Sequence, residues 1–535
     1  MSTSAENLNL AASPTSRFGG RPKPGTLSLF VALLLAGLAF VAYSLVHEIG
    51  AVGVHHITWL PFVLLGVALL IALGFEFVNG FHDTANAVAT VIYTNSLPPA
   101  AAVVWSGLFN FLGVLVSTGT VAFGIISLLP VELILQVGSG SGFAMVFALL
   151  IAAILWNLGT WWLGLPASSS HTMIGSIIGV GVANALMHGR SGTSGVDWGQ
   201  AAKVGYSLLL SPLFGFVLAA GLLLVMKVLI KKPELYQAPE GDAPPPWWVR
   251  GLLILTCTGV SYAHGSNDGQ KGMGLIMLIL VGTVPMAYGL NRAMPVDQMT
   301  QFAAVAQVTA QSLQPYAEQA HPADPRQVLS NYVRSRHRTP ETIAAVADLA
   351  LDLQQQVLAH RDPAKLPADL VGNMRNDMYL SSEAIRLLGK DPGVHFDAAT
   401  TTNLAAYSQD IHHATRFIPL WVKIAVAIAL GLGTMIGWKR VVITVGEKIG
   451  KTHLNYAQGV SAELVAMATI GAADGMGLPV STTHVLASGV AGTMAAGGSG
   501  LQMSTLRNLA MAWVLTLPAA MLLSGLLYAL FSRLV

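Results

Sequence analysis

Long apolar runs recur along the whole chain and constrain its fold more than any other feature of the sequence. Four of the clearest are Leu27–Val46, Trp59–Val78, Val204–Ile230 and Leu506–Phe531. A helix needs about 20 apolar residues to cross a bilayer, so each run predicts a transmembrane helix. Only 10% of the 535 residues are charged, whereas a soluble globular chain carries about 25%. The sequence therefore predicts an all-α, polytopic membrane protein.

Other apolar runs are shorter than a full span and flank clusters of Gly, Pro and polar residues. Examples are Met173–Leu186, Gly251–Tyr262 and Val485–Ala496. Interrupted helices of this kind occur in membranes where exposed backbone lines a cavity. We therefore expect a transmembrane helical bundle that contains broken helices and two re-entrant hairpins.

Changes in composition divide the chain into four regions. Residues 1–26 are polar and lack an apolar core, which favours a disordered N-terminal tail over a cleaved signal. Residues 27–290 are expected to form a transmembrane region. Residues 291–416 hold 13 of the 26 acidic residues and show helical apolar spacing, which predicts a soluble, mostly helical insertion. Residues 417–535 complete the transmembrane region.

Basic residues indicate the orientation of the chain in the membrane, because they favour the cytoplasmic side. They gather in three clusters, at Arg17–Lys23, Lys227–Lys232 and Lys439–Lys451. The three clusters share one side if Trp59–Asn95 is a single broken crossing and Phe143–Leu186 is a hairpin. The same count places residues 291–416 outside the cytoplasm. We expect a multi-pass protein of a bacterial-type inner membrane, with the lipid bilayer as its surroundings.

A short motif occurs twice among the apolar runs. It reads "GLPASSSHT" over residues 164–172 and "GLPVSTTHV" over residues 477–485. Proline ends one helix or begins the next, which would leave the hydroxyl residues at a helix N-terminus, where N–H groups bind anions and phosphate especially. A single copy is equally consistent with a plain kink whose hydroxyls bond back to the helix. Two copies favour an anion site, and its candidate residues are Ser169, Ser170, His171, Thr482, Thr483 and His484.

A second pair of motifs carries carboxylates. It reads "NGFHDTANA" over residues 79–87 and "HGSNDGQKG" over residues 264–272, so that Asp83 aligns with Asp268. An intramembrane carboxylate is costly unless it binds a cation, carries a proton or meets a partner. Each half of the chain contains an Asp motif followed by a Gly-Leu-Pro motif. This order predicts two inverted repeats with a site between them.

Other polar residues in apolar surroundings leave alternatives open. Glu76 and Glu463 are intramembrane carboxylates with either a functional or a paired structural role. His82 and His264 are either site residues or hydrogen-bonded packing residues, and Lys271 either acts in the site or pairs with an aspartate. The net charge of +2 gives no indication of nucleic-acid binding. The absence of a Gly-Xaa4-Gly-Lys-Ser/Thr motif argues against an ATP-driven pump.

Together the four motifs resemble those of the inorganic phosphate transporter (PiT) family. Here they read "GFHDTANA", "PASSSH", "GSNDGQKG" and "PVSTTH". The resemblance implies an inverted-repeat carrier that moves phosphate with a coupling cation. Carried over by position, it implies phosphate contacts from Ser169, Ser170, Thr482 and Thr483, with Asn86 and Asn267 beside them. It also implies cation or proton coupling by Asp83 and Asp268, to which we add Glu463, His171 and His484.

Three departures from the family pattern bear on the coupling ion. His82 stands where the family often has Asn, Lys271 where a second Asn is usual, and Asn110 where sodium-coupled members carry a glutamate. Each change removes a potential sodium ligand or adds positive charge. The chain thus resembles the bacterial low-affinity branch, which moves phosphate, often as a neutral divalent-metal complex, with protons.

Alternative functions remain at this point. A sodium-coupled phosphate symporter and a sulfate permease fit the same fold. A Ser–His hydrolase fits poorly, because Ser170 and His171 are adjacent and no nucleophile elbow is present. We expect no enzymatic activity and no cofactor beyond transported or coupling ions such as protons, Na⁺ or Mg²⁺. The expected partners are inorganic phosphate and a possible second copy of the chain.

Overall fold

The computed structural model describes residues 24–51, 59–129, 139–239, 241, 243–317, 321–360 and 362–534, and residues 84–86, 193, 364 and 368–369 by their backbone alone. Within these ranges the chain is helical, and its sole extended pairing is an isolated bridge between Gly450 and Leu501. The predicted N-terminal tail lies almost wholly outside the described residues. The first helix within the described residues, α2, begins at Pro24, close to the predicted start of the first apolar run.

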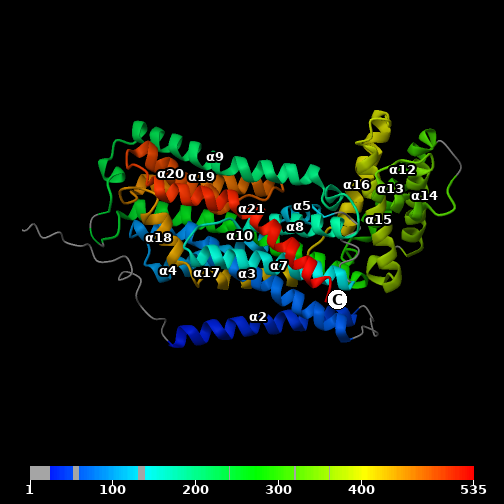
Figure 1. Cartoon of the computed structure of the whole chain (residues 1–535), viewed down its shortest axis with the longest axis horizontal. Helices are drawn as coiled ribbons and strands as arrows, with labels where there is room; N and C mark the ends of the chain where they lie inside the picture. The colour runs from blue at the N-terminus through cyan, green and yellow to red at the C-terminus, as the bar shows by residue number, and fades with distance from the viewer. Residues whose placement is uncertain are drawn as a thin grey trace, which may run out of the picture.

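Long helices lie roughly side by side and form an elongated bundle (Figure 1). Seven described helices are long and apolar enough to cross a membrane, and a pair of shorter helices bent by 69°, Ala398–Thr415 and Leu420–Thr434, passes the same test together. The expectation of an all-α chain with many membrane helices is thus confirmed. The bundle comprises α2 (Pro24–Ala51), α3 (Trp59–Tyr93), α4 (Pro99–Val116), α5 (Thr120–Ile126), α7 (Gly140–Trp162), α8 (Ser169–Met187), α9 (Trp198–Leu229), α10 (Trp247–Thr283), α17 (Leu420–Thr434), α18 (Lys439–Glu447), α19 (Tyr456–Gly475), α20 (Thr482–Gly497) and α21 (Met503–Phe531).

The two Asp motifs lie inside unbroken helices, and our expectation of helix breaks at these motifs was wrong. Helix α3 runs for 35 residues and α10 for 37. Neither motif contains proline, and a glycine inside a helix costs only about 1 kcal/mol. Their glycines serve close helix contacts instead. A Cβ atom on Gly80 would lie 2.3 Å from the Leu430 carbonyl oxygen, and one on Gly265 would lie 2.1 Å from that of Asn110.

The Gly-Leu-Pro motifs do interrupt the helices, in the same way in both copies. Helix α7 gives way to α8 at the first motif and α19 to α20 at the second, and the two helices of each pair pack against one another. Gly164 and Gly477 adopt left-handed φ angles of 68° and 67°. Such angles are open to glycine at little cost. Ser168 and Ser481 then cap the new helices by accepting backbone N–H bonds at 3.2 Å.

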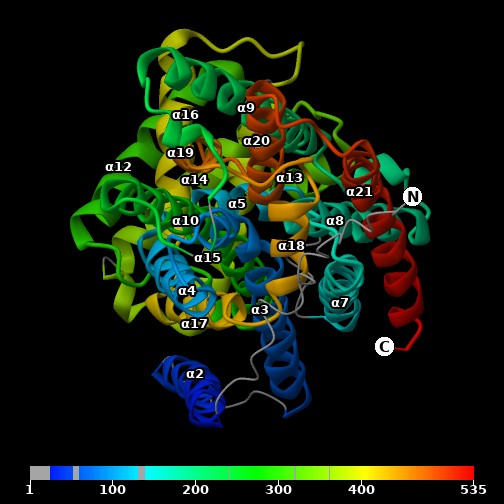
Figure 2. The same cartoon turned by 90° about the vertical axis from the view of Figure 1, so that its left-hand side faces the viewer.

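The polar block predicted to be an insertion is helical and packs around its own hydrophobic cluster. This cluster includes Phe302, Leu349 and Tyr407, and it shares no residue with the two clusters inside the bundle. The helices gather at one end of the bundle, while α2 and α21 lie at its periphery (Figures 1 and 2). They are α12 (Val296–Leu313), α13 (Pro325–Ser335), α14 (Thr342–His360), α15 (Ala368–Leu388) and α16 (Ala398–Thr415). The short helix α11 (Pro285–Tyr288) precedes the insertion and contributes Tyr288 to a cluster of the bundle.

Candidate functional site

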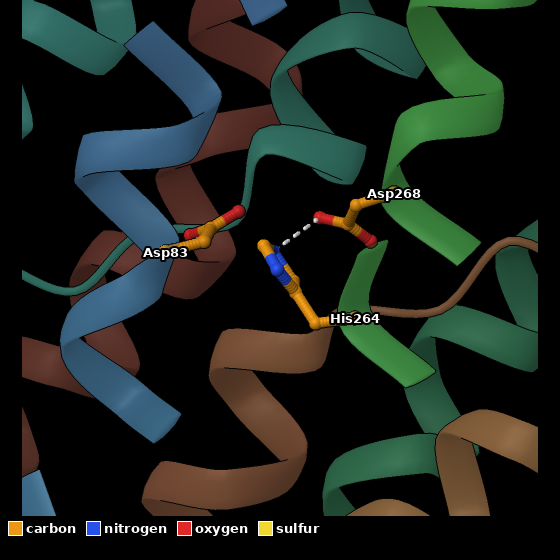
Figure 3. A group of neighbouring side chains, drawn as sticks. All are labelled: Asp83, His264 and Asp268. Carbon is orange, nitrogen blue, oxygen red and sulfur yellow. Dashed lines mark ion pairs between the residues drawn. The ribbon is translucent and has the colours of Figure 1, made fainter. Parts of the chain in front are cut away.

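The two aspartates of the repeated motif come together at the centre of the bundle. Asp83 lies on α3 and Asp268 on α10, and these helices pack against one another. Asp83 is 3% exposed and Asp268 is fully buried. Figure 3 shows the two side chains approaching from opposite helices with His264 between them. Sequence reasoning expected this meeting of the two motifs, and the helix packing produces it.

Both Gly-Leu-Pro motifs donate a hydroxyl to one carboxylate. Ser169, at the start of α8, donates to Asp83 Oδ2 at 2.7 Å. Thr483, at the start of α20, donates to Asp83 Oδ1 at 2.5 Å. The chain thus brings two helix N-termini, about 310 residues apart in sequence, to a single buried negative group. The positive end of each helix dipole favours a negative charge at this point.

The second aspartate belongs to a buried ion pair. Lys271 Nζ lies 2.6 Å from Asp268 Oδ2, and both side chains are fully buried. Lys271 also donates to Ser169 Oγ at 3.1 Å, while Ser169 lies 3.4 Å from Asp268. Lys271 therefore pairs with an aspartate, and its contact with Ser169 leaves a role in the site open as well. Because Ser169 contacts both aspartates and the lysine, it links all the charges of the site.

His264 completes a group of potential cation ligands. One ligand atom from each of Asp83, His264 and Asp268 lies within 4.8 Å of the others. His264 Nε2 is 3.3 Å from Asp268 Oδ2, and its Nδ1 is 2.9 Å from Asn110 Oδ1. A bond from Nδ1–H to the amide oxygen leaves Nε2 free of hydrogen and facing the carboxylates. An acceptor behind the imidazole is the usual way in which proteins orient a metal-binding histidine.

Among the remaining hydroxyl and amide candidates, Ser170 and Asn267 donate to backbone carbonyls of the second motif, and Thr482 does not bond to the aspartates. Ser170 donates to the Val480 carbonyl at 2.6 Å, so the first motif holds the second. Asn267 donates to the Leu478 carbonyl at 3.1 Å. The Thr482 hydroxyl is buried and has no hydrogen-bond partner among the described side chains and backbone. The Asn86 side chain lies outside the described residues.

The rings of the histidines of the two motifs lie against one another at a tilt of 40°. The ring centroids of His171 and His484 are 4.7 Å apart, and His484 stacks on Trp513 at 4.2 Å. The Trp513 indole donates to the Pro166 carbonyl at 3.1 Å. This tryptophan of α21 therefore braces both motifs. Sequence reasoning missed it, because nothing local distinguishes it from an ordinary apolar helix residue.

Two buried glutamates lie on either side of the site along α3. Glu463, on α19, accepts hydrogen bonds from Thr90 and Thr256. Thr90 lies about two helical turns from Asp83, or roughly 10 Å along the axis. Glu76 lies the same distance on the other side, where it accepts a bond from Asn79 at 3.3 Å. The structure thus separates Glu463 from the aspartates with which the sequence grouped it.

Asp474 was missed at the sequence level. It lies in the last turn of α19 and accepts bonds from Ser266 at 2.6 Å and Gln270 at 2.7 Å. It thereby links the end of α19, just before the second motif, to α10. Its position, three residues before the second Gly-Leu-Pro motif, was the feature of the sequence that could have identified it.

Comparison with known proteins places this site in a family. Residues 79–524, which include all four motifs, match the Phosphate transporter family. Over 489 residues the chain is 44% identical to the low-affinity inorganic phosphate transporter PitA of Escherichia coli (strain K12), covering 87% of this chain and 96% of PitA. PitB of the same strain is 42% identical with the same coverage. A solved structure described as the sodium-dependent phosphate transporter shares 19% identity and a TM-score of 0.49, covering 88% of this chain and 100% of that one.

The family match confirms the resemblance that the four motifs indicated. It also confirms that the protein is a transporter rather than an enzyme, which removes the Ser–His hydrolase from the alternatives. Together with its apolar helices, the match identifies a multi-pass membrane protein. The chain, with its paired aspartates and its two Gly-Leu-Pro helix ends, belongs to the phosphate transporter family.

Proposed function

We propose that this protein is a secondary active transporter that imports inorganic phosphate as a complex with a divalent metal, in symport with protons. Family membership and the names of the relatives support phosphate as the substrate. The observation that carries the proposal is the convergence of Ser169 and Thr483, from two helix N-termini, beside a group of potential cation ligands. In this proposal phosphate lies between the two helix ends and the cation lies against the aspartates.

Charge balance supports a cation entering with phosphate. A phosphate dianion next to two carboxylates is strongly repelled, since unit charges 4 Å apart interact by about 4 kcal/mol at an effective dielectric constant of 20. Lys271 offsets one of these negative charges. A divalent cation held by Asp83, His264 and Asp268 would offset two of the three negative charges that remain, so that the loaded site keeps a single negative charge.

The ligand chemistry favours a divalent metal over sodium as the companion ion. Imidazole suits divalent transition metals, while carboxylates also suit Mg²⁺ and Mn²⁺. Sodium prefers oxygen ligands, whereas His264, which is hydrogen-bonded to Asn110, offers a nitrogen at this site. We assign proton or cation coupling to Glu463, His171 and His484 as well, because each is a titratable group buried within the bundle or beside the site.

The halves of the chain are proposed to be inverted repeats whose Gly-Leu-Pro helix pairs are re-entrant. The matched glycine angles and serine caps of the two motifs support a common origin. In this arrangement residues 291–416 lie outside the cytoplasm. Cysteine labelling of that region in intact cells, in a Cys257→Ser background, tests the topology. Labelling that requires opened membranes contradicts it.

Uptake into proteoliposomes tests the transport proposal directly. Purified protein is reconstituted, and proton and sodium gradients are imposed separately, with and without Mg²⁺. We expect phosphate uptake that follows the proton gradient, persists without sodium and increases with Mg²⁺. A strict sodium requirement would favour a sodium-coupled symporter, and preferential uptake of sulfate would favour a sulfate permease.

A further inference from the structure

A basic cleft lies where the helices of the insertion meet the bundle, well apart from the aspartate site. It has a volume of about 370 Å³. One wall comes from the connection between α8 and α9, and the other from the ends of α13 and α15. Its charged lining consists of Arg190, Asp197, Arg334, Arg336, Arg386 and Lys390. Five of these six groups are cations, which makes the cleft strongly positive.

Two of the cations are neutralised by carboxylates at the edge of the cleft. Arg386 lies 3.0 Å from Asp197 and 2.6 Å from Glu383. Arg336 shares Glu383 at 3.1 Å. The Arg386–Asp197 pair joins α15 to the start of α9, so it fixes the insertion against the bundle. These contacts account for the structural role of two of the five cations.

The other three cations have no carboxylate partner among the residues that the structure describes. Arg190 donates to the neutral Asn184 side chain at 2.8 Å, and Arg334 to the Asn331 side chain at 2.9 Å. Lys390 makes no ion pair within the described ranges, and it lies against Gly199 at the start of α9. Three positive groups from three different segments therefore face one cleft without an ion pair among the described residues, although the Asp197 carboxylate lies near Lys390 beside Gly199.

A simpler reading is that each of these cations only stabilises a helix C-terminus. Arg190 follows the end of α8, Arg334 lies in the last turn of α13, and Lys390 follows the end of α15. Such a cation contributes about 0.3–1 kcal/mol. That benefit does not require three helix ends to converge on one cleft, where like charges repel unless an anion joins them.

We propose that this cleft binds a phosphate-class oxyanion and thereby concentrates the substrate at the insertion end of the bundle. Guanidinium groups match the geometry of phosphate oxygens with paired N–H donors. A positive cleft raises the local concentration of anions and their rate of association. The choice of free phosphate as the ligand rests on the proposed function, whereas the anion site itself rests on the three cations that form no ion pair among the described residues.

The test compares two variants that each lose three positive charges. The cleft variant carries Arg190→Gln, Arg334→Gln and Lys390→Gln. The control variant carries Lys231→Gln, Lys365→Gln and Lys451→Gln, which change exposed lysines outside the cleft. Binding of radiolabelled inorganic phosphate is measured by equilibrium dialysis on full-length protein in nanodiscs of neutral lipid. We expect two equivalents for the parent and the control variant, and one for the cleft variant.

A transport assay tests the same site independently. In proteoliposomes the cleft variant should show a several-fold higher KM for phosphate with an unchanged maximal rate, and the difference should shrink at high salt because screening weakens attraction at a distance. Equal stoichiometry and equal KM for the two variants would overturn the proposal and leave the helix C-terminus reading.

Two further outcomes separate the sources of the ligand and the two proposals. Loss of the second equivalent when phosphatidylglycerol replaces the neutral lipid would assign the cleft to a lipid headgroup and overturn free phosphate as its ligand. In the other outcome the parent protein binds the second equivalent of phosphate and the cleft variant loses it, while neither transports phosphate. That result would support the anion site and contradict the proposed function.

Discussion

The two Gly-Leu-Pro helix ends have nearly the same sequence and the same turn, yet they use their hydroxyls in opposite ways. In the first copy the second hydroxyl, Ser169, reaches the aspartates, and the third, Ser170, holds backbone. In the second copy the third hydroxyl, Thr483, reaches Asp83, and the second, Thr482, has no described partner. Equivalent positions in the two repeats therefore have different roles.

The first helix end contacts several charged groups of the site. Ser169 contacts Asp83, Asp268 and Lys271, and Thr483 of the second helix end donates to Asp83. The second motif is in turn held through its backbone by Ser170 and by Asn267 of α10. An internal repeat thus supplies similar parts, and the packing of distant segments decides what each part does.

The largest expected effects come from the two aspartates. Asp83→Asn and Asp268→Asn should each abolish phosphate uptake in proteoliposomes, because in the proposed mechanism both carboxylates hold the coupling cation or proton. Asp268→Asn should also lower the yield of folded protein, since it leaves Lys271 buried and unpaired, which costs about 3–5 kcal/mol.

A compensating change separates the two effects of the Asp268 substitution. Adding Lys271→Met to Asp268→Asn should restore the folded yield, measured by size-exclusion chromatography and thermal unfolding, without restoring uptake. Near-normal uptake by the double variant would reduce this ion pair to a structural role.

The next largest effect should distinguish the equivalent residues Ser169 and Thr482. Ser169→Ala removes the donor shared by both aspartates, and a hydrogen bond to a charged group contributes about 1.5–3 kcal/mol. We expect phosphate affinity to fall roughly ten-fold to a hundred-fold, since 1.4 kcal/mol is a factor of ten. Thr482→Ala should leave affinity within a few-fold of the parent. Equal losses in binding measured on purified protein would contradict the asymmetry described here.

A smaller effect should separate Thr483 from Ser170. Thr483→Ala should weaken phosphate binding by roughly ten-fold, because its hydroxyl reaches the site. Ser170→Ala should instead lower thermal stability by about 1 kcal/mol, because it breaks a neutral bond to the Val480 carbonyl. This expectation revises the sequence interpretation, in which all four hydroxyls contacted phosphate. If Ser170→Ala lowered phosphate affinity more than Thr483→Ala, that interpretation would be restored.

Local chemistry explains which features the sequence could predict. The helix breaks at the repeated motif follow from glycine and proline, and the caps follow from serines that precede the new helices. The meeting of Asp83 and Asp268 was predictable because the two halves of the chain contain the same motifs in the same order. These features depend on a few neighbouring residues or on the repeat itself.

The remaining features depend on contacts between distant segments, which local patterns do not contain. The glycines of the Asp motifs pack against other helices instead of breaking their own, and that depends on Leu430 and Asn110. The division of work between Ser169 and Thr482 depends on the exact register of two helix ends. The partners of Glu463 depend on how α19 lies against α3 and α10.

A double-variant cycle on phosphate binding tests most directly whether both helix ends hold one ion. Affinity is measured on purified parent protein, Ser169→Ala, Thr483→Ala and the double variant. The account predicts that each single change weakens binding, that the double change weakens it further, and that the two costs depart from additivity by more than about 0.5 kcal/mol, the limit for independent sites. If the single variants and the double variant all bind phosphate like the parent, the Gly-Leu-Pro motifs are structural kinks and the anion site lies elsewhere.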